Sequence, residues 1–124
     1  MSDSAKNQQS LDAHETPGIP KASTAIATLF EKAADHLTAA ELNWFSSSMR
    51  DQAALELDNV SQAIEAAGCM VASSDLSTCM QDEETLSRFL FSVSSQLDTI
   101  TGFMKIGSEA SYRLKLKAEA KSQA

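Results

Sequence analysis

The chain has 124 residues, which is room for one domain. Hydrophobic residues make up 43% of it and aromatic residues 6%, a mixture that favours closely packed helices and is unfavourable for sheets. The formal net charge of −7 would make the body of the protein repel nucleic-acid phosphates. No run reaches the roughly 18 apolar residues that a membrane span needs, and the first residues lack the apolar core of a secretory signal. We therefore expect a cytoplasmic protein.

Residues 1–20 are mostly polar and contain both prolines, so we expect a flexible N-terminal tail. From Ile26 to Leu37 apolar residues recur at the spacing of one helical face, which predicts a short first helix. Ser23 or Thr24 could cap it, because either hydroxyl can accept a hydrogen bond from a free backbone N–H group. We expect the helical domain to cover residues 21–119 and a C-terminal tail to cover 120–124.

A second helix is predicted to start at Thr38, since Thr38 and Glu41 have the spacing of a capping box. The same residues could instead lie inside a helix continuous with the first. A long apolar stripe follows, in steps of three or four residues, along one side of about eight helical turns. It consists of Leu42, Phe45, Met49, Ala53, Leu57, Val60, Ile64, Ala67 and Val71.

Residues 73–81 are predicted to connect this helix to a third, because serine and aspartate favour turns. The acidic run 82–84 would then sit at the positive end of a helix dipole. We expect the third helix to continue to about Ala118, with a kink at Gly107. Its stripe, flanked by Phe89 and Phe103, consists of Leu86, Leu90, Val93, Leu97, Ile100 and Met104.

Two stripes of similar length joined by about ten residues predict an antiparallel helical hairpin. The short first helix would lie across it, which gives an all-α three-helix bundle. The seam of the hairpin is expected between Leu42–Val71 and Leu86–Met104.

A few large apolar residues fall outside the predicted seam. At 100° per residue, Trp44 and Leu55 lie near the far side of the second helix, and Phe91 and Ile106 lie away from the third stripe. Either the first helix covers Trp44 and Leu55, or these residues form an intermolecular face in a homodimer or with another protein. Tryptophan is enriched at such contacts because it offers a large rigid area.

Three acidic residues, Asp51, Asp58 and Glu65, recur every seven residues on the outer side of the second helix. Such a row is either an ordinary solvated surface or a docking strip for a basic partner. A charged docking strip raises the association rate more than the affinity.

The last twenty residues hold five basic and two acidic side chains, so they could contact nucleic acid or complement the helix dipole and the acidic body. Cys69 and Cys79 could approach each other across the turn, but no spacing of a zinc site is present. His14 lies in the tail, and His36 is expected to be exposed at the end of the first helix. We find no nucleophile–base pair and no phosphate-binding loop, and we expect neither an enzyme, nor a cofactor, nor a metal.

Residues 59–104 combine an alanine-rich helix, a Ser74-Asp75-Leu76 turn region and a second hydrophobic helix. This pattern resembles short uncharacterised helical-hairpin proteins of pseudomonads and related bacteria. The resemblance covers about a third of the chain and implies the hairpin fold without an activity.

These observations favour a small acidic protein–protein interaction module, of the inhibitor, immunity-protein or adaptor type, that docks on a basic bacterial target. The expected contact residues are Trp44, Asp51, Leu55, Asp58, Glu65 and Phe91. We also expect a homodimer. Two alternatives stay open: a structural homo-oligomer without a separate ligand, and nucleic-acid contact through the basic C-terminal segment.

Overall fold

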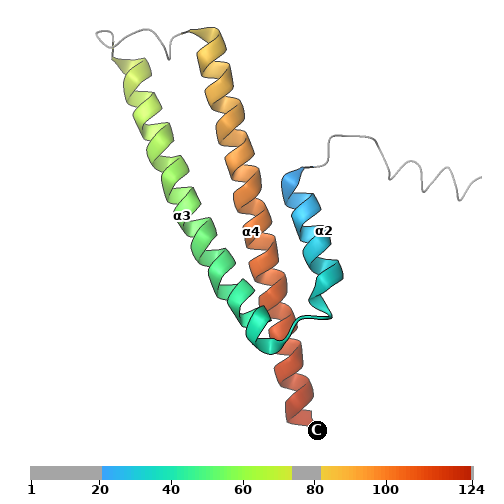
Figure 1. Ribbon diagram of the computed structural model, residues 1–124. Helices are drawn as coiled ribbons and strands as arrows, with labels where there is room; N and C mark the ends of the chain where they lie inside the picture. Colours follow the sequence, from blue (N-terminus) through green and yellow to red (C-terminus); the bar gives the residue numbers. More distant parts are fainter. Residues whose placement is uncertain (1–20, 74–81, 124) are drawn as a thin grey trace, which may run out of the picture.

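The computed structural model describes residues 21–73 and 82–123, and all regular structure within them is helical. The three helices are α2 (Ala22–Ala34), α3 (Ala39–Ala72) and α4 (Glu83–Gln123). α3 and α4 run antiparallel, and α2 lies along the other side of α4 (Figure 1). The predicted all-α three-helix bundle is thus confirmed. The tail at 1–20 and most of the connection, 74–81, fall outside the described residues.

The start of α2 differs from the prediction. Lys21 occupies the N-cap position with an extended backbone, and its side chain makes no capping hydrogen bond. Ser23, which we expected as a cap, lies in the first turn and is 2% exposed. Its backbone N–H and its hydroxyl both donate to the carboxylate of Asp98 on α4. The N-terminus of α2 is therefore satisfied by a residue 75 positions away, which local pattern cannot reveal.

The start of α3 confirms the capping box. The backbone N–H of Glu41 donates to Thr38 Oγ1 at 3.2 Å, and the backbone N–H of Thr38 donates to Glu41 Oε2 at 2.8 Å. Two backbone donors that the helix cannot use are satisfied in this way. The helix therefore begins after Thr38 and is separate from α2.

α4 begins at Glu83, where the predicted acidic run faces the positive end of the helix dipole. It continues to Gln123, beyond the expected end at Ala118, and it remains helical through Gly107, where we expected a kink. Gly107 is a packing residue: a Cβ placed there would lie 3.5 Å from the backbone oxygen of Ser46 and 3.6 Å from Met49 Cβ on α3. Gly102 plays the same part toward α2, because its Cβ would lie 3.1 Å from Ser23 Cα.

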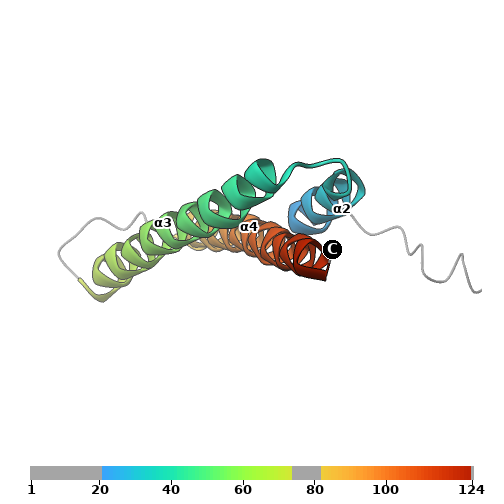
Figure 2. The same cartoon turned by 90° about the horizontal axis from the view of Figure 1, so that it is seen from below.

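The core has two parts, one along the hairpin and one where all three helices meet. Ala53 and Val60 of α3 pack with Val93 and Ile100 of α4. At the other end, a cluster joins α2 to both long helices; its buried members are Phe30, Ala34, Leu42, Ile106 and Ala110. Seen from below in Figure 2, α2 and the start of α3 lie toward the same side of α4. Burial of these side chains is the main stabilising term of the fold.

The structure corrects the predicted position of Ile106. We expected it to lie outside the hairpin seam, but it is 4% exposed and packs in the three-helix cluster. The reason is that α2 occupies a second side of α4, so the buried face of α4 widens toward its C-terminal half. Further contacts tie α4 to the end of α2: Arg113 pairs with Asp35, and Lys117 Nζ donates to the backbone oxygen of Leu37 at 2.7 Å.

The structure also corrects the predicted seam. In α3 the small residues Ala53 and Ala67 are buried, together with Val60, whereas the larger stripe members Leu57, Ile64 and Val71 are 48% to 50% exposed. α4 shows the same division: Val93 and Ile100 are buried. The stripe members Leu90, Leu97 and Met104 are 41% to 57% exposed. Three of the nine stripe members of α3 and three of the six of α4 are therefore exposed at the side of the hairpin.

Candidate partner-binding surface

Five of the six predicted contact residues share one side of α3, which we call the outer face of α3: Trp44, Asp51, Leu55, Asp58 and Glu65. All five are exposed. They lie opposite the buried residues of α3, such as Leu42 and Val60, that pack toward the other helices. Trp44 and the three acids are spaced by seven residues, or about 10 Å along the helix axis. The face is thus a narrow strip along the length of α3.

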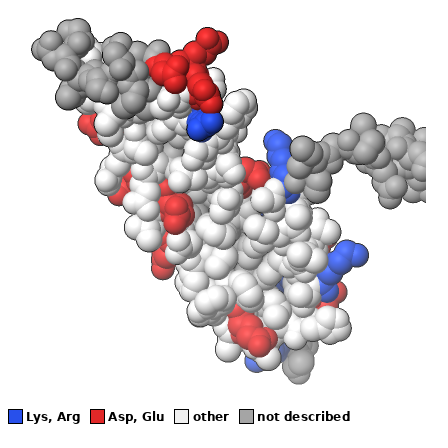
Figure 3. All heavy atoms as spheres, turned by 45° about the horizontal axis from the view of Figure 1, so that its top comes forward, with Lys and Arg blue, Asp and Glu red and all other residues white. Residues whose placement is uncertain are grey.

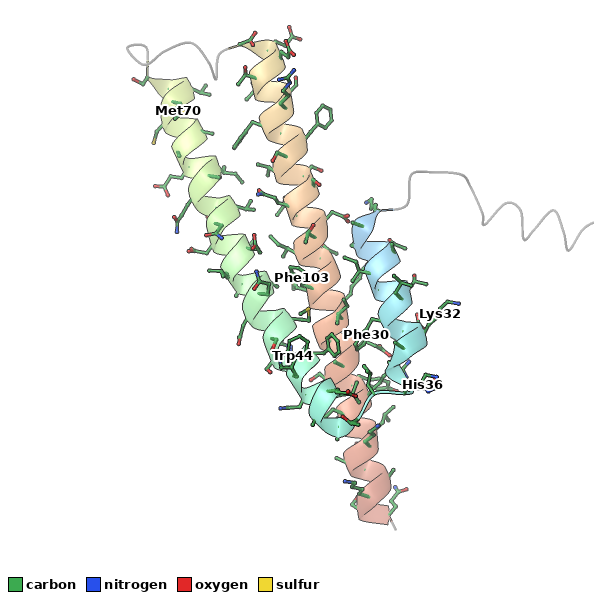
Figure 4. All side chains as sticks on the ribbon, viewed as in Figure 1. Phe30, Lys32, His36, Trp44, Met70 and Phe103 are labelled. Carbon is green, nitrogen blue, oxygen red and sulfur yellow. The ribbon has the colours of Figure 1, made fainter. Side chains whose placement is uncertain are left out.

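Trp44 is held at the lower end of this strip by an aromatic chain that leads into the core. Its ring packs edge-on against Phe45, with ring centroids 4.9 Å apart, and Phe45 packs in the same manner on Phe30, at 5.2 Å. Phe30 is 7% exposed, whereas Trp44 remains 56% exposed. Figure 4 shows Trp44 on α3 and Phe30 between α2 and the long helices. A tryptophan braced in this way offers a large apolar surface with little rotational freedom left to lose on binding.

The acidic residues of the strip carry uncompensated charge. Within residues 21–73 and 82–123, the ion pairs are Arg88–Glu84, Arg113–Asp35 and Arg113–Glu109, and none involves the outer face of α3. Asp58 accepts one neutral hydrogen bond, from Gln62 Nε2 at 2.9 Å. In Figure 3 acidic atoms recur along the edge of the molecule that α3 forms, and this view shows no basic atoms along that edge. The strip therefore presents negative charge that a basic surface could neutralise.

None of the described helices covers Trp44 or Leu55. α2 packs on α4 and contributes Phe30 to the core, but it leaves Trp44 56% and Leu55 55% exposed. The described helices therefore leave this face uncovered. The alternative in which the first helix covers Trp44 and Leu55 is wrong.

Phe91 does not belong to the same surface. It is 77% exposed and lines a shallow groove between α4 and the start of α2, with Lys21, Thr24 and Asp98 among its neighbours. α4 stands between this groove and α3, so one flat partner could not contact Phe91 and the outer face of α3 together. The predicted site is thus divided into two.

Lys32, His36 and Cys69 are all exposed. Figure 4 shows Lys32 and His36 pointing away from the bundle, and Cys69 is exposed near the end of α3. Cys79 and His14 lie outside the described residues, so the expected approach of the two thiols has no structural counterpart here. No cluster of three metal-ligating side chains occurs in the described part of the chain. None of its helices combines the length and apolar character needed to cross a membrane.

Sequence reasoning missed one surface, which the half-exposed stripe members of α3 and α4 form. A signal for it was present, because small residues alternate with large ones along α3 at the positions assigned to the seam. Small residues allow two helices to approach closely, which moves the larger neighbours to the side. Comparisons with protein-family models, with curated proteins and with solved structures found no match.

Proposed function

We propose that this chain is a protein–protein interaction module that binds a basic partner protein through the outer face of α3. The observation that carries the proposal is the strip itself: an exposed, braced tryptophan in line with three unpaired acids. Interfaces commonly combine an aromatic anchor with charges that guide the encounter. An inhibitor, an immunity-type protein or an adaptor would each use such a strip.

The binding mode assigns different roles to the two kinds of residue. Trp44 would be buried against the partner and would slow dissociation, since desolvated aromatic side chains dominate interface energies. Asp51, Asp58 and Glu65 would speed association by attracting a basic surface, an effect that added salt screens.

Nucleic-acid contact through the C-terminal segment receives less support. Two of its five basic side chains are engaged within the protein, because Arg113 pairs with Asp35 and Glu109 and Lys117 bonds to Leu37. These contacts match the alternative in which the segment complements the acidic body.

Quantitative affinity capture from a lysate of the source organism tests the proposal. The wild type is compared with Trp44→Ala and Asp58→Lys, each beside a matched control on α2: Leu29→Ala, which removes a 69% exposed apolar residue, and Glu31→Lys, which reverses an exposed charge. We expect both strip variants to lose the same basic protein and both controls to retain it. Equal capture by all five proteins would remove the proposal.

A further inference from the structure

The hairpin carries a second apolar surface, which we call the open face: Leu57, Ile64 and Val71 on α3, and Leu90, Leu97 and Met104 on α4. These six side chains are 41% to 57% exposed. Exposed apolar residues that occur singly are ordinary, but a contiguous row of this length usually marks a contact surface.

The two rows lie on the same side of the hairpin. Leu57 and Met104 line one groove between α3 and α4, together with the buried residues Ala53 and Ile100 beneath it. From that point each row continues in steps of seven residues, up α3 and back along α4. Because the helices are antiparallel, these steps place Ile64 near the level of Leu97, and Val71 near that of Leu90. The six side chains thus form one band along the hairpin.

The acidic strip does not share this side of the molecule, but α2 borders it along α4. Leu97 lines a groove with Thr24, and Met104 lines one with Ala27. α2 and the start of α3 lie toward one side of α4 in Figure 2, where the core contains Leu42, Phe30 and Ile106. By the helix period, the α4 row of the open face lies roughly opposite Ile106 and adjoins α2. On α3 it is separated from the row Asp51, Asp58 and Glu65 by roughly a third of a turn.

The six side chains of the band are uncharged, but charged residues of both signs line the grooves at its edges: Arg50 beside Leu57, Lys21, Asp98 and Lys105 beside Leu97, and Glu31 and Glu109 beside Met104. The positions beside the two rows at helical spacing are small or hydroxyl-bearing: Ala54, Ser61, Gly68, Ser87, Ser94 and Thr101. In a chain with a net charge of −7, an uncharged band with edge charges of both signs is a face that a second acidic copy can approach. Small border residues also allow another pair of helices to approach closely.

We infer that a second copy of this chain covers the open face, so that two hairpins form a four-helix bundle. The rows on α3 and α4 have the same seven-residue spacing and run in opposite directions. The hairpin therefore presents nearly the same pattern after a rotation by half a turn, which suits the self-complementary contact of a two-fold dimer. Six side chains that are 41% to 57% exposed offer on the order of 500 Å² per copy, which is less than the ~800 Å² per partner of a standard interface but reaches the roughly 1,000 Å² in total that a specific contact needs.

The residues outside the structure fit this face less well. Segment 1–20 contains Met1, Leu11 and Ile19 as its only larger aliphatic residues, and two prolines. It cannot match six large side chains spread over both long helices. The six side chains of the band itself hold no charge for a basic protein to recognise. The dimer extends the proposed function without depending on it, because the two outer faces of α3 stay available on the dimer.

Sedimentation equilibrium from low micromolar to near-millimolar concentration tests the inference. We expect the wild type to approach twice its 13.3 kDa mass. Leu57→Glu and Leu97→Glu should each raise the dimer dissociation constant at least about tenfold, because each places a charge in the contact. Leu55→Glu is the matched control: it lies two positions from Leu57 on the same helix and is 55% exposed against 50%, but on the outer face of α3.

Circular dichroism of each variant verifies that the helices are retained. A wild type that stays monomeric over the whole concentration range overturns the inference, whatever the variants do. So does a wild-type dimer that both open-face variants leave intact, since the contact would then lie elsewhere. Capture of a basic partner by the outer face of α3 is an independent measurement, so failure of one proposal is distinguishable from failure of the other.

Discussion

Ser23 and Asp98 join α2 to α4 through two hydrogen bonds to one carboxylate. The hydroxyl of Ser23 donates to Asp98 Oδ1 at 2.5 Å, and its backbone N–H donates to Asp98 Oδ2 at 3.2 Å. Asp98 therefore does for α2 what a capping side chain does at other helix starts, and it also brings negative charge to the positive end of the helix dipole. Gly102, one turn further along α4, allows Ser23 to come this close.

Ser23→Ala should weaken the attachment of α2. The substitution removes the hydroxyl that donates to Asp98 Oδ1, a part-buried hydrogen bond, at a cost of about 1 kcal/mol in the free energy of unfolding. Thr24→Ala, at the exposed neighbouring position, should cost less. Urea unfolding of both variants measures the difference, and equal loss in the two would mean that the Asp98 contact contributes little.

Stability should depend on the ionisation of Asp98. The hydroxyl and then the backbone N–H of Ser23 hold the pKa of Asp98 below its ordinary value of 3.8, with a smaller effect from Lys21. A depressed pKa in the folded state stabilises the protein above the unfolded-state pKa, and this contribution is lost as the pH falls through the folded-state value. The thermal midpoint of wild type should thus exceed that of Asp98→Asn at neutral pH, and the gap should narrow below pH 3.8. A gap that does not narrow as the pH falls below 3.8 would contradict the assignment.

Replacing the three glycines of the long helices by alanine should change the stability of the protein differently at each position. Gly68→Ala should stabilise the protein by about 0.5–1 kcal/mol, because helix propensity improves and nothing lies within 4 Å of the new Cβ. Gly102→Ala should destabilise it, since the new Cβ meets the Ser23 backbone at 3.1 Å. Gly107→Ala should fall between them, because its nearest neighbour at 3.1 Å is the flexible side chain of Arg50. Thermal unfolding of the three variants gives the order directly.

Substitutions in the core and on the outer face of α3 should differ in their effect on the free energy of unfolding. Leu42 is fully buried, and Leu42→Ala should cost about 2–5 kcal/mol by leaving a cavity where three helices meet. Leu55→Ala, at an exposed position of the same helix, should change the free energy of unfolding by no more than about 0.5 kcal/mol. A large loss at Leu55 would show that something in the protein does cover the outer face.

Local chemistry made much of the fold predictable. The capping box at Thr38 and Glu41, the acidic start of the third helix and the period of the two stripes each depend on residues close in sequence. The docking of α2 depends instead on Asp98 and Gly102, which are distant in sequence and ordinary in composition. For that reason the cap of α2 and the burial of Ile106 were predicted wrongly.

The candidate site was predictable in part for a similar reason. The angular positions of Trp44 and the three acids follow from the helix period alone, so the outer face of α3 emerged from the sequence. The position of Phe91 relative to the other helices depends on how the three helices pack, and the helix period alone cannot predict that packing. The open face was assigned to the seam because a stripe shows which residues are apolar but not how the partner helix is rotated against them.

The claim that the outer face of α3 attracts a basic protein is tested most directly by association kinetics with the captured partner. Stopped-flow measurements over a range of ionic strength would compare wild type, Asp58→Lys and the control Glu31→Lys. The association rate of wild type should fall steeply with salt, and Asp58→Lys should be slower than wild type and less salt-dependent, while Glu31→Lys should resemble wild type. Association rates that are independent of salt, or equal for wild type and Asp58→Lys, would contradict the account.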